Sequence, residues 1–203
     1  MIAIIDYGVG NLFSLKSSLS MIGAEAAVTS DPDVIRAADR IILPGVGAFG
    51  DARRKLADSG LDSVLLCEAA KGKPVMGICL GMQMLFEKSY EYGEHEGLGL
   101  IPGEVVPMAG KLPEGLKVPH IGWNALDISC KNHPLMKYTK DGDCVYFVHS
   151  FYAENCTANT LATAEYGIGV TAAVAKDNVM GCQFHPEKSG TVGLNILKAF
   201  CEV

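Results

Sequence analysis

A cysteine flanked by glycines, directly after a short apolar strand, is the feature that most restricts how this chain can fold. The run Val75–Ile78 has the apolar character of a buried strand, and Cys79 follows it within Gly77-Ile78-Cys79-Leu80-Gly81. Small neighbours on both sides allow a sharp turn from strand to helix, which leaves one side chain exposed at the top of a sheet. The pattern therefore predicts that Cys79 stands at a strand-to-helix elbow.

The first half of the chain alternates short apolar strands with amphipathic helices. We expect strands at Met1–Ile5, Glu25–Val28, Arg40–Leu43 and Val75–Ile78, and helices at Leu12–Ile22, Asp51–Leu56 and Leu61–Ala70 and from about Leu80. Strands that alternate with helices imply a parallel sheet covered on both faces. Ligands of such sheets bind beyond the carboxyl ends of the strands, so a site is expected in the loops that follow them.

The second half of the chain contains strands with little helix between them. They are expected at Glu104–Pro107, Val118–Ile128, Cys144–Tyr152, Thr160–Glu165, Val170–Ala175 and Asn178–Phe184, with a turn at Asp177-Asn178 and a closing helix at Leu194–Phe200. The sequence has no internal repeat and no linker. We therefore expect one α/β domain over residues 1–203, a flavodoxin-like three-layer open sheet with a mostly parallel core and an antiparallel-rich second half.

Charge and cysteine content argue against several classes of protein. The 203 residues include 17 basic and 23 acidic ones, for a formal net charge of −6, and no basic cluster, so binding to nucleic acid or to an anionic membrane is not expected. Seven cysteines without a Cys-x-x-Cys pair match neither a disulfide framework nor a zinc site. Without a signal peptide or an apolar run of ~20 residues, we expect a cytoplasmic protein, with no metal and no cofactor.

Nucleophilic chemistry at Cys79 needs a base and a group that orients the base. The dipole of the helix that begins after Cys79 would favour the thiolate. In Phe184-His185-Pro186-Glu187, His185 can accept the thiol proton and return it to a leaving group, and Glu187 can hold the imidazole in the required tautomer. Taken separately, the histidine could be a capped strand end and the glutamate a solvated surface acid. Beside the elbow, the sequence favours a catalytic triad.

An acyl-transfer site also needs hydrogen-bond donors for the developing oxyanion. The backbone N–H of Leu80 is one candidate, because it follows the nucleophile. Val46, in Pro44-Gly45-Val46-Gly47, is another, because glycines permit unusual peptide orientations; the alternative is that this segment is merely a turn. Phosphate binding is disfavoured, since neither this turn nor Asp6-Tyr7-Gly8-Val9-Gly10-Asn11 matches a P-loop or a dinucleotide fingerprint.

Three segments together resemble the signatures of class I (triad) glutamine amidotransferases: Pro44-Gly45-Val46-Gly47, Gly77-Ile78-Cys79-Leu80-Gly81-Met82-Gln83 and Phe184-His185-Pro186-Glu187. More narrowly, the chain is similar to the glutaminase subunits of imidazole glycerol phosphate synthase. That similarity lies in Asp6-Tyr7-Gly8-Val9-Gly10-Asn11-Leu12, Gly45-Val46-Gly47-Ala48-Phe49-Gly50-Asp51, Pro119-His120-Ile121-Gly122-Trp123-Asn124, Tyr146-Phe147-Val148-His149-Ser150-Phe151-Tyr152 and Gln183-Phe184-His185-Pro186-Glu187-Lys188-Ser189. It covers essentially the whole chain.

The resemblance implies a reaction and a partner. Cys79 would attack the side-chain amide of glutamine, ammonia would leave, and water would hydrolyse the thioester to glutamate. Ammonia would then pass into a (β/α)8-barrel cyclase subunit, which makes imidazole glycerol phosphate and an aminoimidazole carboxamide ribotide in histidine biosynthesis. By their places in the motifs, the residues that contact glutamine would be Gly45, Gly47, Gln83, His149, Ser150 and Phe151.

The resemblance also implies where the partner docks. A single tryptophan is more often in a core than on a surface, but the family places the Trp123 segment at the cyclase contact. Asn11, Tyr146 and Lys188 are further candidates for this heterodimer interface. Family members are nearly silent until the partner binds its ligand, and we expect the peptide near Gly45-Val46 to flip on activation, so that the Val46 N–H enters the oxyanion hole.

Three other interpretations stay open at this point. A glutaminase for another acceptor, such as anthranilate, carbamoyl phosphate or pyridoxal phosphate synthesis, would share the triad, although the Trp123 segment and the opening Asp6–Leu12 segment argue against it. A cysteine sensor or chaperone on a flavodoxin-like fold would need neither the His-Pro-Glu sequence nor Gln83. A catalytically dead scaffold subunit would normally have lost its nucleophile or base, and Cys79 and His185 are both present.

Overall fold

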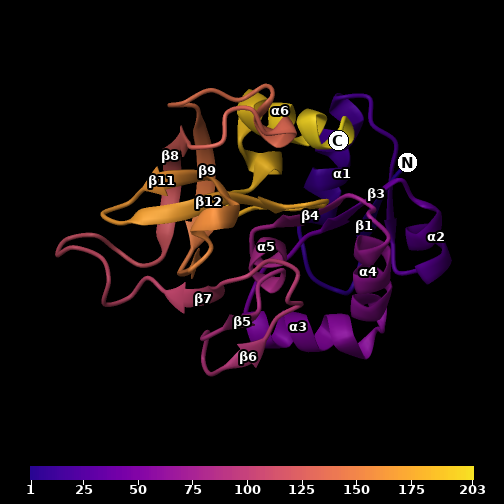
Figure 1. Cartoon of the computed structure of the whole chain (residues 1–203), viewed down its shortest axis with the longest axis horizontal. Coiled ribbons are helices and arrows are strands. Elements are labelled where there is room, and N and C mark those ends of the chain that lie inside the picture. Colours follow the sequence, from indigo (N-terminus) through magenta and orange to yellow (C-terminus); the bar gives the residue numbers. More distant parts are fainter.

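The computed structural model of the chain describes residues 1–203 and contains two β-sheets with helices on both faces of the larger one (Figure 1). The larger sheet has nine strands in the order β2-β1-β3-β4-β13-β12-β11-β8-β9, and the smaller has four in the order β10-β7-β5-β6. This confirms the α/β class with a parallel core and an antiparallel second half. The separate smaller sheet was not expected.

Five parallel strands form the core of the larger sheet. They are β2 (Ala26–Thr29), β1 (Ile2–Ile5), β3 (Arg40–Leu43), β4 (Val75–Ile78) and β13 (Val179–Cys182). All residues of β1, β4 and β13 are buried, as expected for short apolar strands covered on both faces. The parallel register aligns the carboxyl ends of β4 and β13, because Ile78 pairs with Cys182.

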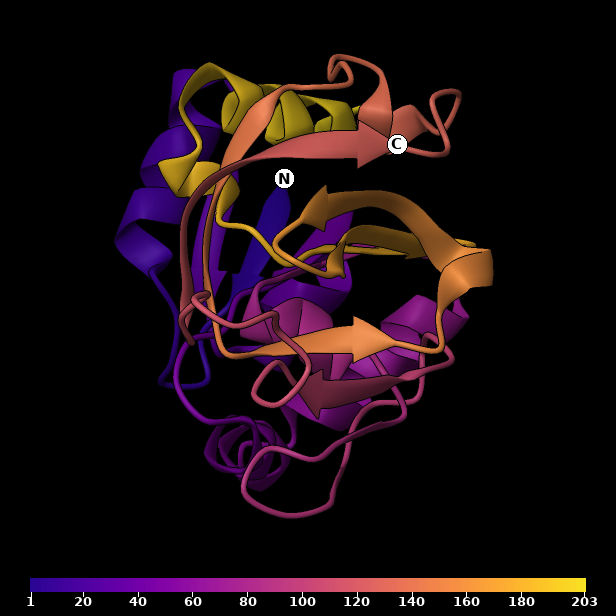
Figure 2. The ribbon, with the colours of Figure 1, turned by 90° about the vertical axis from the view of Figure 1, so that its left-hand side faces the viewer.

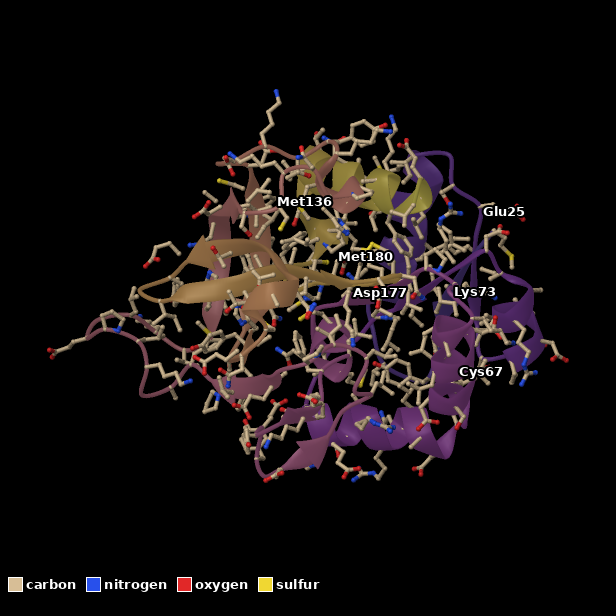
Figure 3. The ribbon with its side chains drawn as sticks, viewed as in Figure 1. Glu25, Cys67, Lys73, Met136, Asp177 and Met180 are labelled. Carbon is tan, nitrogen blue, oxygen red and sulfur yellow. The ribbon has the colours of Figure 1, made fainter.

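Two helical layers cover the two faces of this sheet. One face packs against α2 (Pro32–Ala37), α3 (Phe49–Asp58), α4 (Leu61–Ala70) and α5 (Leu80–Met84), and the other against α1 (Leu12–Met21) and α6 (Gly190–Cys201). Figure 3 shows Met136 near α6 and Met180 in the centre of the molecule, and both belong to the core on the α1 and α6 side. Residues alternate between the two cores along β1, where Ala3 faces one and Ile4 the other. None of the helices has the length and apolar character that crossing a bilayer requires.

Antiparallel strands complete the larger sheet and form part of the smaller one. Beyond β13 lie β12 (Gly169–Lys176), β11 (Thr160–Glu165), β8 (His120–Ile128) and β9 (Cys144–His149). The smaller sheet contains β10 (Phe151–Glu154), β7 (Glu104–Pro107), β5 (Lys88–Ser89) and β6 (His95–Glu96). Figure 2 shows β10 and β7 side by side, consistent with their antiparallel pairing.

One expected strand is wrong in a way that matters for the site. The sequence suggested a single strand over Cys144–Tyr152, but the strand ends at His149 and a new one begins at Phe151 in the other sheet. The chain changes sheet at Ser150, since His149 pairs with His120 and Phe151 pairs with Pro107. As a result, His149-Ser150-Phe151 crosses the space between the sheets, beside the carboxyl ends of the parallel strands.

Candidate active site

Four loops meet where the parallel strands end. The segments after β1, β3, β4 and β13 carry Tyr7, the Pro44–Gly47 turn, Cys79 and His185 respectively. Tyr7 is buried, and its hydroxyl donates to the Pro44 carbonyl at 2.7 Å, which connects the first loop to the glycine turn. The arrangement follows the rule that ligands of α/β sheets bind beyond the carboxyl ends of the strands.

Cys79 occupies the sharp elbow that the sequence predicts. Its φ of 55° and ψ of −112° are unusual for a residue with a side chain, and such strain is found at functional sites. The flanking glycines are needed for space: a Cβ on Gly81 would lie 1.9 Å from the Leu43 carbonyl oxygen, and one on Gly77 would lie 2.6 Å from the Gly81 carbonyl oxygen. The elbow therefore tolerates no larger residue at either position.

His185 lies between Cys79 and Glu187. Its Nδ1 is 2.9 Å from Glu187 Oε1, and both side chains are 3% exposed. A carboxylate oxygen only accepts, so Nδ1 carries the proton and Nε2 is left for Cys79, which lies with His185 on the same cavity wall. The structure thus brings the three residues of the expected triad together in the expected order.

The pKa of His185 reflects these neighbours. Burial alone would lower it, but hydrogen bonds to Cys79 and Glu187 and the charges of both groups outweigh burial and raise the pKa to about 10. The imidazole is therefore held in its protonated form near neutral pH, beside Cys79 on the cavity wall. An imidazolium in this position can donate a proton to a leaving group.

A cavity of about 320 Å³ opens above Cys79. Five of the six residues for which the sequence predicted contact with glutamine line it, together with Cys79 and His185. The full wall consists of Val46, Gly47, Cys79, Leu80, Gln83, Glu91, Pro119, Val148, His149, Ser150, Phe151 and His185. Gly45 is absent from this wall. It packs instead under the elbow, where a Cβ would lie 2.7 Å from the Gly81 nitrogen.

The two expected oxyanion donors lie at this cavity. Val46 and Leu80 both line it, and the Val46 N–H makes no hydrogen bond within the chain. Gly47 has a φ of +91°, a conformation that favours glycine. The helix that follows Cys79 has only five residues, Leu80–Met84, so its dipole supports a thiolate less than we expected from the sequence.

Glu91 is a wall residue that sequence reasoning missed. Burial raises the pKa of its carboxyl group. The hydrogen bond that the carboxylate accepts from the Phe49 N–H at 2.7 Å acts in the opposite direction but is the smaller effect. It is the only acidic side chain on the cavity wall. No local pattern marks Glu91 in the sequence, because it lies in the connection between two-residue strands that were not predicted.

Gln83 and His149 both form hydrogen bonds to the carbonyl group of Phe151. Gln83 Nε2 donates to it at 3.0 Å, and His149 Nδ1 lies 2.8 Å away. His149 Nε2 is 2.9 Å from Nδ1 of His120, which is fully buried between the rings of Phe147 and Tyr166. Burial lowers the pKa of His149 to about 4. We therefore assign His149 a neutral, structural part in shaping the cavity.

Three of the four expected partner residues lie together at the surface, with Trp123 and Lys188 exposed and Tyr146 half-buried, whereas Asn11 lies elsewhere. Trp123 is 55% exposed, against the general tendency of tryptophan to be buried, and its ring lies 6.0 Å from that of Tyr146. The Lys188 ammonium lies 5.8 Å from the centre of the Tyr146 ring. Asn11 instead donates from its amide to Glu187 Oε1 at 3.4 Å. We call Trp123, Tyr146 and Lys188 the aromatic patch.

Comparison with known proteins agrees with this geometry. The family model described as glutamine amidotransferase class-I matches residues 3–202. In solved structures, a glutamine amidotransferase superposes with a TM-score of 0.77 at 18% identity, covering 100% of this chain and 98% of that one. The structure of PurLQS from Thermotoga maritima gives a TM-score of 0.75 at 21% identity, covering 99% and 97%. At these identities, the structures support the fold alone.

Sequence relatives are much closer. The imidazole glycerol phosphate synthase subunit HisH of Caldanaerobacter subterraneus subsp. tengcongensis is 52% identical over 204 residues, covering 100% of this chain and 98% of the relative. The HisH subunit of Methanothermobacter thermautotrophicus is 49% identical over 203 residues, again covering 100% and 98%. The chain belongs to the class I glutamine amidotransferases. Within that class, it belongs to the HisH family of imidazole glycerol phosphate synthase subunits.

Proposed function

We propose that this chain is the glutaminase subunit of an imidazole glycerol phosphate synthase. It hydrolyses glutamine to glutamate and supplies ammonia to a (β/α)8-barrel cyclase subunit in histidine biosynthesis. The observation that carries the proposal is the position of His185, which bridges the sulfur of Cys79 and the carboxylate of Glu187 at the base of the cavity. The HisH relatives support the choice of pathway and partner.

The first half of the reaction uses the thiolate and the imidazolium. The Cys79 sulfur attacks the side-chain amide carbon of glutamine, and the carbonyl oxygen becomes an oxyanion that the N–H groups of Leu80 and Val46 stabilise. His185 then gives its Nε2 proton to the amide nitrogen, and the carbon–nitrogen bond breaks. Ammonia leaves, and a glutamyl thioester remains on Cys79.

The second half returns the enzyme to its starting state. His185, now neutral, takes a proton from water as the water oxygen attacks the thioester carbon. The carbon–sulfur bond breaks, glutamate departs, and the Cys79 thiolate again faces the protonated imidazole. Glu187 stabilises that cation each time it forms, because its carboxylate accepts the Nδ1 proton.

Glutamine has a charged end that the cavity must also recognise. The Glu91 carboxylate is placed to receive the α-ammonium group, since no other acidic side chain lines the cavity. Gln83 gives both hydrogens of its amide to other groups, to Phe151 and Gln183, so its Oε1 remains to accept from the substrate. Backbone around Ser150 completes the wall.

Ammonia must reach the partner without becoming protonated, which requires a sealed contact between the subunits. The aromatic patch is our candidate for that contact, because Trp123 is exposed and tryptophan and tyrosine often anchor interfaces. We also propose that residues 1–203 act as one domain and that the protein works in the cytoplasm. The reorientation of the Gly45-Val46 peptide on activation remains a proposal as well, supported by the unengaged Val46 N–H.

A variant without the nucleophile tests the proposed function. In complex with the cyclase, Cys79→Ala should lose glutamine-dependent synthesis by a factor of about 10⁴ or more and retain synthesis from added ammonium salts. Persistent use of glutamine by this variant would remove Cys79 from the mechanism. If the folded and bound variant makes no product from ammonium salts either, the acceptor is another than the one proposed.

A further inference from the structure

Gln183 has a fully buried side-chain amide that the mechanism above does not use. It directly follows β13, and the pairing of Ile78 with Cys182 sets Gln183 beside Cys79, the next residue along each strand. Gln183 Oε1 accepts from Gln83 Nε2 at 2.9 Å, and Gln183 Nε2 lies 3.7 Å from the Cys79 sulfur. A buried amide is costly unless both ends are bonded, and its donor end has only the nucleophile as a partner.

The direction of these hydrogen bonds is fixed by a backbone carbonyl. The Phe151 carbonyl can only accept, so the Gln83 atom 3.0 Å from it is the amide nitrogen. That same nitrogen faces the Gln183 side chain, so the Gln183 atom that it meets must be the oxygen. The opposite end of the Gln183 amide, the end that faces the sulfur, is therefore the NH2 group. The assignment follows from geometry and does not depend on locating hydrogen atoms.

We propose that Gln183 is a catalytic residue whose side-chain N–H stabilises the Cys79 thiolate. The inference rests on the proposed function, because it takes Cys79 as the nucleophile. A hydrogen bond to a charged acceptor is stronger than one to a neutral acceptor. The bond is thus stronger to the thiolate than to the thiol or to the thioester sulfur. Because α5 is short, this donor and His185 provide the main stabilisation of the sulfur anion.

This role has two consequences for the reaction. Before attack, the donor increases the fraction of Cys79 that is ionised. During hydrolysis of the thioester, it makes the sulfur a better leaving group, since thiolates that are more stable leave faster. Gln183 is fully buried and does not line the cavity, so glutamine does not displace it. It can therefore act in both halves of the cycle.

Alkylation of Cys79 tests this role without substrate. We would follow the reaction with iodoacetamide from pH 5 to 10 by mass spectrometry of the peptide that contains Cys79, in the isolated chain without glutamine. Cys67, which is exposed on α4, serves as an internal control in the same sample. For Gln183→Met, which removes the donor at similar volume, the pH midpoint for Cys79 should rise by about 1 unit or more while that of Cys67 stays unchanged.

Steady-state kinetics in the complex with the cyclase supplies the second readout. Gln183→Met should lower kcat for glutamine at least tenfold near pH 7, with a smaller change in KM. Synthesis from ammonium salts should be unchanged. If Gln183→Met does not fold, Gln183→Asn is measured by the same two criteria, because its shorter side chain withdraws the donor from the sulfur.

The possible outcomes separate the two claims. An unshifted alkylation midpoint for Cys79, in a folded variant, would overturn the role of Gln183 and leave the proposed function intact. A shifted midpoint with normal kcat would also overturn it, because the stabilisation would then not matter for catalysis. Use of glutamine by Cys79→Ala would instead remove the proposed function, whatever the result for Gln183.

Discussion

His185 Nδ1 lies 2.9 Å from Glu187 Oε1, with both side chains buried at the end of β13. The two residues are only two positions apart in the sequence, and their side chains can meet because a short 3-10 turn, Pro186–Lys188, brings the carboxylate back to the ring. Glu187 therefore sets both the tautomer and the orientation of the base, and leaves Nε2 for the sulfur of Cys79.

Replacing the carboxylate should show how much this orientation contributes. Glu187→Gln keeps the shape of the side chain and removes its charge, so the imidazolium loses its partner. We expect glutamate release in the complex to fall by about two to four orders of magnitude, with binding to the cyclase retained. Glutamate release within twofold of the parent chain would show that Glu187 has no part in catalysis.

The pKa of His185 offers a spectroscopic test of its contact with Cys79. In Cys79→Ala, the hydrogen bond and the charge of the sulfur are lost, whereas burial, which lowers the pKa, remains. The pKa of His185 should therefore fall from about 10 by at least about 1 unit. Titration of the imidazole by NMR in the two proteins measures this directly. An equal pKa in both would mean that the two side chains do not interact.

Buried His149 predicts a loss of stability in mild acid. Burial lowers its pKa in the folded chain to about 4 from the ordinary histidine value of 6.5, so the unfolded chain binds the proton more tightly. The contribution of His149 is fully present above pH 6.5 and is lost as the pH falls towards 4, by up to about 3 kcal/mol. The free energy of unfolding of the parent chain and of His149→Gln can be measured with urea at several pH values in this range. We expect it to fall more steeply with decreasing pH in the parent chain than in His149→Gln. The same pH dependence of the free energy of unfolding in both proteins would contradict the lowered pKa of His149.

Gly81 should be the most sensitive glycine of the elbow. A Cβ there would lie 1.9 Å from the Leu43 carbonyl oxygen, so Gly81→Ala must push β3 and the elbow apart. We expect a destabilisation of about 1–3 kcal/mol or more, with loss of glutaminase activity. Gly169→Ala is the matched control, because a Cβ at Gly169 meets nothing within 4 Å and its φ is not positive. Equal stability of the two variants would contradict the packing described here.

The aromatic patch should be required for binding the cyclase. Trp123→Ala removes the largest exposed side chain of the patch, and we expect the Kd for the cyclase to rise at least tenfold, as for other aromatic anchors. Met21→Ala is the control, since Met21 is 74% exposed but lies at the far end of α1 from the catalytic loops. Calorimetric titration measures both. Unchanged affinity for Trp123→Ala would place the contact elsewhere.

Much of the fold followed from local patterns in the sequence. Strands β3, β4 and β7 and helix α4 have the predicted bounds, because each is a short apolar or amphipathic run limited by glycine, proline or charged residues. Helix α2, Pro32–Ala37, was not predicted; it has six residues and only one that is buried, Ile35. The two-residue strands β5 and β6 were also missed, since a pair of residues carries no periodicity.

The site was predictable where chemistry depends on motifs and not where it depends on tertiary contact. Cys79, His185 and Glu187 stand in recognisable local sequences, and the structure brings them together. Glu91 reaches the cavity only through the path of an irregular loop, and Gln183 meets the sulfur only because β13 pairs with β4. The strand break at Ser150 arises because the residues before it pair in one sheet and the residues after it pair in the other. No local sequence pattern predicts such a change of sheet.

Direct detection of the intermediate tests whether Cys79 forms the glutamyl thioester. The complex with the cyclase would be mixed with glutamine, quenched in acid within milliseconds to seconds, and digested for mass spectrometry. We predict a glutamyl adduct on the peptide that contains Cys79, which disappears on brief treatment with hydroxylamine, as a thioester does. Release of glutamate with no adduct on Cys79, or with an adduct on another cysteine, would contradict it.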